Sequence, residues 1–300
     1  MSATTSAFAA LLLAAAPAAT AALNVFACTP EWGALAKELG GEKASVYTAS
    51  SALQDPHRIE ARPSLIAAAR RADLLVCTGA ELEAGWLPLV QTQSGNPRIQ
   101  RGQPGYLEAA SHVPLLDRPA RVDRSMGDVH PAGNPHLHLD PHNVARIAAV
   151  LGERMAALAP PQAAYYGERT RSFLERWREA AARWEKDAAP LKGVPIVVHH
   201  RNLTYLTHWL GMREVGSLEP RPGLPPTSAH LAELLAALKR DPARAIARAA
   251  YNDARAAGWL AERAGIPSIV LPYTVGGTQA AKDLFELYAD TLARLLAVVN

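Results

Sequence analysis

The sequence has 300 residues, of which 49% are hydrophobic and 20% are charged. This composition is typical of a globular protein with a substantial core, and it excludes a disordered chain and a protein with many membrane spans. The net charge is only +3, without a long run of either sign, so nucleic acid is not an expected partner. Ten histidines stand beside two cysteines, which makes imidazole the side chain to follow for function.

The N-terminal residues 7–22 form an uncharged apolar stretch that ends in small residues, the pattern of a secretory signal peptide. No Lys or Arg precedes it, which departs from the usual pattern. We expect residues 1–22 to be a cleaved signal peptide and the mature protein to reside in the periplasm. The residues before Cys28 make a poor lipidation site, so no lipid anchor is expected.

Beyond the signal peptide, short apolar runs alternate with amphipathic helical stretches. This alternation predicts parallel sheets with crossover helices. It occurs in two series, which predicts two α/β lobes at residues 23–159 and 191–300.

The stretch between the lobes, residues 160–190, reads as one helix. Prolines stand at both of its ends, and aromatic residues recur inside it at helical spacing. About 28 residues at 1.5 Å each span on the order of 40 Å. Two lobes joined by such a rigid rod are expected to enclose a cleft whose opening changes little.

Three histidines, His57, His136 and His200, stand at the ends of predicted elements. Open α/β sheets bind their ligands at such ends. Neutral imidazoles bind zinc well, and ligands from both lobes would hold one ion in the cleft between them. The spacing alone is not specific, because these histidines are far apart in the sequence.

Several longer motifs make the interpretation specific. They are QDPHRIEARPS, ADLLVCTGAELE, GNPHLHLDP, VVHHRNLTYLTHWLG, EPRPGLPPTSAHL and VLPYTVGG. With these motifs the chain resembles the zinc and manganese solute-binding family of bacterial ABC importers, whose two α/β lobes are joined by a long rigid helix. The resemblance covers essentially all of the mature chain.

The resemblance implies a metal site made of His57, His136 and His200, the last counted back eleven residues from Gly211. The family's fourth ligand is an acidic residue or water near the last loop, which leaves Asp283 and water as alternatives. Three imidazoles favour zinc as the bound ion, since manganese prefers sites richer in carboxylate.

We expect the other histidines near these motifs to have roles other than metal binding, or leave their roles open. His138 is expected to support or pack against the site, and His199 to be structural because it alternates to the other strand face. The segment from His130 to His142 is rich in Gly, Pro and Asp, which predicts a loop. Whether that loop collects metal or carries incidental histidines stays open.

Cys28 and Cys77 each end a β-type run. An oxidising compartment permits a disulfide, but neighbouring parallel strands rarely offer its geometry. We therefore expect two buried, unpaired cysteines.

These inferences predict a monomeric periplasmic receptor that binds Zn²⁺ and delivers it to an ABC permease in the inner membrane. A periplasmic metallochaperone is a conceivable further partner. The alternatives are a receptor for manganese or another divalent metal, and a metal carrier without a transporter. A zinc hydrolase is disfavoured, because the chain has no HExxH or GxSxG motif and no carboxylate obviously placed as a general base.

Overall fold

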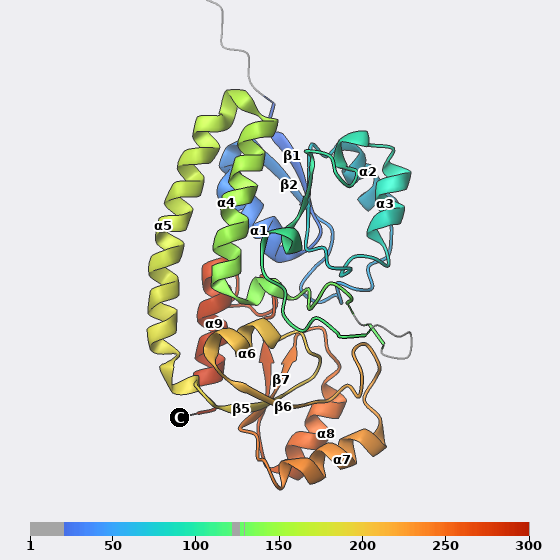
Figure 1. Ribbon diagram of the computed structural model, residues 1–300, viewed down its shortest axis with the longest axis vertical. Coiled ribbons are helices and arrows are strands. Elements are labelled where there is room, and N and C mark those ends of the chain that lie inside the picture. Colours follow the sequence, from blue (N-terminus) through green and yellow to red (C-terminus); the bar gives the residue numbers. More distant parts are fainter. Residues whose placement is uncertain (1–20, 122–126, 129, 300) are drawn as a thin grey trace, which may run out of the picture.

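The computed structural model describes residues 21–121, 127, 128 and 130–299. Nearly all of the expected signal peptide therefore lies outside the described residues. Within them, two parallel four-stranded sheets form two α/β lobes, one above the other in Figure 1. The expected fold class is confirmed, whereas the exact lobe boundaries remain a prediction.

The N-terminal lobe is built on the sheet β2-β1-β3-β4. Its strands are β1 (Leu23–Ala27), β2 (Ala44–Thr48), β3 (Leu74–Cys77) and β4 (Tyr106–Glu108). Its helices are α1 (Pro30–Gly40), α2 (Pro63–Arg71) and α3 (Leu87–Ser94).

Side chains of the central strand β3 alternate between two hydrophobic clusters. Leu74 and Val76 belong to the cluster shared with α1, whereas Leu75 and Cys77 belong to the cluster shared with α2. All four residues are buried. A strand covered by helices on both faces has apolar side chains at every position, because both faces are buried. The uninterrupted apolar run LLVC therefore predicts a buried parallel strand.

The expectation of two unpaired cysteines is wrong, because Cys28 and Cys77 form a disulfide. The register of β1 against β3 pairs Ala27 with Val76, so Cys28 comes opposite Cys77 on the same face of the sheet. Cys28 lies one residue beyond the end of β1. The two Cα atoms are 4.9 Å apart, within the range that a disulfide spans.

The C-terminal lobe is built on the sheet β6-β5-β7-β8. Its strands are β5 (Pro195–Val198), β6 (Arg213–Ser217), β7 (Ala245–Ala249) and β8 (Ser268–Leu271). Its helices are α6 (Thr204–Leu210), α7 (Ser228–Leu238), α8 (Ala254–Ala264) and α9 (Leu284–Leu296).

The long connecting helix expected between the lobes is present as α5 (Ala163–Asp187), which has 25 residues. A short 3₁₀ turn at Pro160–Gln162 precedes it. Helix α4 (Pro141–Leu158) lies beside α5, and the pair runs along one edge of the molecule (Figure 1).

Helix α5 contacts both lobes. On the N-terminal side, Arg169 Nε donates a hydrogen bond of 2.9 Å to the carbonyl oxygen of Glu38 in α1. On the C-terminal side, the ring of Trp184 stacks on Tyr288 of α9 at 4.8 Å between centroids, and Trp177 packs edge-on against the same tyrosine. The connector is therefore part of both cores.

In the described part of the chain, no helix combines the length and the apolar character that crossing a membrane requires.

Candidate metal centre

His57 lies in the loop between β2 and α2, at the carboxyl end of the N-terminal sheet. Its Nδ1 atom is 2.8 Å from Asp55 Oδ1, and the same oxygen accepts the backbone N–H of His57. Trp86 Nε1 donates a hydrogen bond to the carbonyl oxygen of Pro56, and this bond holds the loop that carries His57. The carboxylate holds the proton on Nδ1, so the lone pair of Nε2 is available to a ligand.

His136 lies just before α4 and is fully buried. Asn134 accepts the backbone N–H of His136 and donates to the carbonyl oxygen of Arg201, so it ties this segment to the C-terminal lobe. The Nδ1 atom of His136 is 2.8 Å from the hydroxyl of Tyr273. Its Nε2 atom is buried without a hydrogen-bond partner among the described residues. The lone pair of this nitrogen is therefore available to a metal ion.

His200 follows the end of β5 in the C-terminal lobe. Its Nδ1 atom is 2.7 Å from Glu219 Oε2, and the Glu219 side chain is 13% exposed. The same carboxylate oxygen accepts the backbone N–H of Gly223. Again, a carboxylate holds the Nδ1 proton and leaves Nε2 unoccupied.

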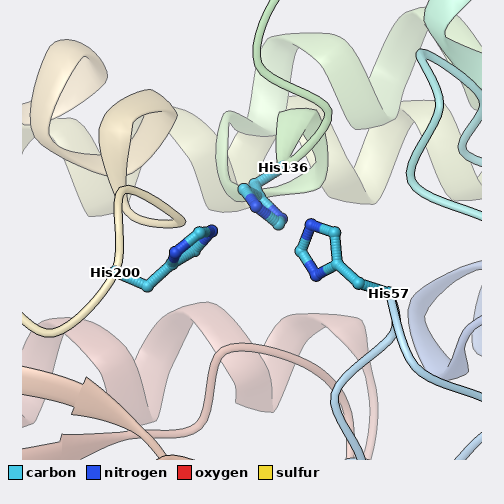
Figure 2. A group of neighbouring side chains, drawn as sticks. All are labelled: His57, His136 and His200. Carbon is cyan, nitrogen blue, oxygen red and sulfur yellow. The ribbon is translucent and has the colours of Figure 1, made fainter. Parts of the chain in front are cut away.

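The three rings converge on one point (Figure 2). One ring nitrogen of each of His57, His136 and His200 lies within 4.8 Å of the others, and ring centroids are 5.4–5.7 Å apart. Tetrahedral zinc with bonds near 2.0–2.1 Å needs ligand nitrogens about 3.3 Å apart. Small inward movements of the rings would therefore suffice to hold such an ion.

His130 lies beside His57, although sequence reasoning left its role open. Its Nε2 atom is 3.2 Å from His57 Nε2, and its ring centroid is 6.4 Å from that of His136. Burial and the neighbouring His57 lower the pKa of His130 to about 4. Burial also lowers the pKa of His136 well below its usual value. Both imidazoles are thus neutral at pH 7, as metal binding requires.

Asp283, the expected acidic ligand, is not brought to this cluster. It caps the N-terminus of α9, where Oδ1 accepts the backbone N–H of Glu286 at 2.8 Å. An aspartate directly before an amphipathic helix is a preferred N-cap residue, which explains why its carboxylate is used locally.

Two other histidines were expected to lack a ligand role. His138 is buried, with Nε2 2.9 Å from the carbonyl oxygen of Tyr273 and Nδ1 3.5 Å from Glu31 Oε1. His199 is buried, and its Nε2 atom is 4.0 Å from Glu219 Oε1. Neither belongs to the converging set.

Sequence reasoning missed Glu219 and Tyr273, which orient His200 and His136. Both lie inside motifs that carry the family resemblance, EPRPG and VLPYTVGG. Tyr273 has a positive φ of 64°, a conformation that costs free energy for a non-glycine residue and is characteristic of ligand sites. Their presence as polar residues inside these motifs was the signal from which their role could have been predicted.

One other group of ligand-type side chains occurs in the described residues: Cys28, Cys77 and Glu83. The two sulfurs are bonded to each other, so they offer no thiolate to a metal. Burial raises the pKa of Glu83 to about 7. Of these two groups, the histidine cluster is therefore the one whose side chains could hold a metal ion.

Residues 25–298 match the sequence profile of the family described as ZnuA, zinc-uptake complex component A, periplasmic. The chain belongs to this family. ZnuA-family proteins are metal-binding components of ABC importers and not enzymes, so the expected absence of catalysis follows from membership.

Individual relatives are distant. The zinc-binding lipoprotein AdcA of Streptococcus pneumoniae is 20% identical over 268 residues, which are 88% of this chain and 52% of AdcA. The chain thus spans about half the length of this curated relative. A crystal structure of ZnuA superposes with a TM-score of 0.75 at 19% identity, covering 92% of this chain and 98% of that one. A cadmium-bound periplasmic metal-binding protein from Candidatus Liberibacter asiaticus gives 0.75 at 16% identity, covering 92% and 99%.

Proposed function

We propose that this chain is a periplasmic zinc receptor that delivers Zn²⁺ to the permease of an ABC importer. The observation that carries the proposal is the convergence of His57, His136 and His200, contributed by both lobes, with the Nδ1 atom of each imidazole held by a neighbouring side chain. Such outer hydrogen bonds fix imidazole orientation and raise ligand basicity.

Zinc is proposed over manganese because of the donor set. No carboxylate among the described residues joins the three converging histidines. Imidazole nitrogen suits zinc, whereas manganese prefers oxygen donors. The carboxylates of Asp55 and Glu219 lie behind the imidazoles and offset the charge of a divalent ion without binding it.

His130 is proposed as the fourth ligand in place of Asp283. The Nε2 atoms of His57 and His130 are 3.2 Å apart, a separation compatible with two ligands of one tetrahedral zinc ion. This assignment gives a four-imidazole site in a tetrahedral array, with water as the remaining alternative for the fourth position.

The cellular part of the proposal comprises export by residues 1–22, residence in the periplasm as a monomer, and docking on an inner-membrane permease. A metallochaperone that loads the site is a further proposed partner. A receptor without a transporter is the alternative, and deletion of the permease separates the two: zinc uptake in limiting zinc should then fall to the level of a strain lacking this protein.

The direct test is titration of chelator-treated protein with Zn²⁺ and Mn²⁺ by isothermal calorimetry. We expect one tight zinc site per chain and weaker manganese binding. His57→Ala, His136→Ala and His200→Ala should each abolish tight zinc binding, whereas His208→Ala serves as a matched control outside the cluster. Unchanged zinc binding in all three cluster variants would reject the site.

A further inference from the structure

A cavity of about 570 Å³ opens beside the histidine cluster. His130, His136 and His200 form part of its wall. This volume is in the range of sites that bind small molecules, and a bare metal ion held by imidazoles does not need it. The cavity therefore has room for a small molecule next to the ion.

Prolines recur in the walls of the cavity. Four prolines contribute to them: Pro119 and Pro135 from the segment between β4 and α4, and Pro220 and Pro222 from the loop after β6. The proline ring fixes φ, so the wall has less backbone freedom to lose at these four positions when a ligand binds. Less freedom to lose means a lower ordering cost of binding.

Positive charge predominates in the cavity wall. Three arginines, Arg118, Arg201 and Arg221, line it together with the carboxylates of Asp117 and Asp128. Such a surface disfavours the approach of a lone cation and favours an anion.

Both aspartates already have cationic neighbours. Asp117 Oδ2 is 3.2 Å from Arg201 Nη2, and Asp128 Oδ2 is 3.7 Å from Arg58 Nη2. Arg118 makes no hydrogen bond or ion pair with the residues that the structure describes. Its planar guanidinium offers the paired donors that recognise a carboxylate.

We propose that the centre takes up its metal ion together with a small carboxylate chelator, for which citrate is the probe. The inference rests on the proposed metal-binding function and deepens it by naming the form of the cargo. His57, His136 and His200 hold the ion, and carboxylate oxygens of the chelator bind it from the cavity side. A free carboxylate of the chelator pairs with Arg118 and Arg201.

The location of His130 gives this arrangement a specific consequence. His130 stands in the cavity wall, on the side from which the chelator approaches. With the ion alone, its imidazole supplies the fourth donor; with the chelator present, carboxylate oxygens take that position. Citrate should therefore compensate for loss of His130 but not for loss of His57.

The test is equilibrium dialysis of the chelator-treated protein with saturating Zn²⁺ and radiolabelled citrate, with protein-bound zinc measured in parallel. We expect one citrate per bound zinc and none on metal-free protein. Acetate, which has a single carboxylate, should not compete at equal concentration. Arg118→Gln should weaken citrate binding to the zinc-loaded protein about tenfold, and the matched control Arg213→Gln, whose arginine pairs with Asp241 outside the cavity, should leave it unchanged.

The second arm uses His130→Ala. Its zinc affinity should fall without citrate and recover at least severalfold with citrate, while His57→Ala recovers nothing. If the wild-type protein binds zinc but retains no citrate, or if citrate only strips zinc from it, the chelator proposal is overturned and the receptor proposal stands. If the wild-type protein binds no zinc with or without citrate, both proposals fail.

Discussion

Replacing Glu219 with Gln tests how much the carboxylates behind the imidazoles contribute. Glu219 Oε2 is 2.7 Å from His200 Nδ1, and the side chain is 13% exposed, so the interaction is a charge-assisted hydrogen bond with little solvent around it. Loss of such a supporting partner lowers metal affinity about 10- to 100-fold, which corresponds to about 1.4–2.7 kcal/mol. We expect the upper half of that range, because the variant loses the charge of a group with little exposure to solvent.

The measurement is zinc affinity by competition with a chromophoric chelator at pH 7.5, on Glu219→Gln and on the matched control Glu233→Gln. Glu233 is exposed on α7, so its variant should bind zinc like the wild type. Thermal unfolding of the metal-free variants shows whether both are folded. A folded Glu219→Gln protein whose zinc affinity stays within twofold of wild type would refute the idea that this carboxylate supports His200.

Three further outcomes are expected. The disulfide closes a sequence separation of 49 residues, so Cys28→Ala with Cys77→Ala should lower the free energy of unfolding by about 4 kcal/mol in urea titrations; an equally stable variant would contradict this. Burial lowers the pKa of His130 to about 4, so the folded metal-free protein binds fewer protons than the unfolded chain between pH about 4 and 6.5 and should lose stability as the pH falls through that window. His130→Gln should flatten this dependence, and identical pH profiles would argue against it. Trp177→Ala removes a buried ring between α5 and α9 and should cost about 3–5 kcal/mol in the same urea assay, a loss below 1 kcal/mol being incompatible with the described packing.

Much of the architecture could be predicted because hydrophobic periodicity is a local property. The run LLVC at β3 and the aromatic spacing in α5 each reflect which faces are buried. Strand ends could likewise be expected to carry ligands, since the carboxyl ends of parallel strands share one edge of a sheet. His57 and His200 follow β2 and β5 in that way.

The remaining features depend on contacts that no local pattern encodes. The pairing of Cys28 with Cys77 follows from the register between β1 and β3, which only the folded sheet determines. The position of His130 depends on the path of a loop rich in Gly and Pro, to which neither helical nor strand periodicity applies. The role of Asp283 as the N-cap of α9 is equally hard to foresee, because aspartate is favoured both at a helix N-cap and as a metal ligand.

Because α5 is bonded to α1 at one end and stacked on α9 at the other, wide separation of the two lobes would require breaking both attachments. A ligand would then reach the histidines through the cavity that Pro119 and Pro222 help to line. On that route, release of a bound ion would need only local movement at the cavity and no hinge motion between the lobes.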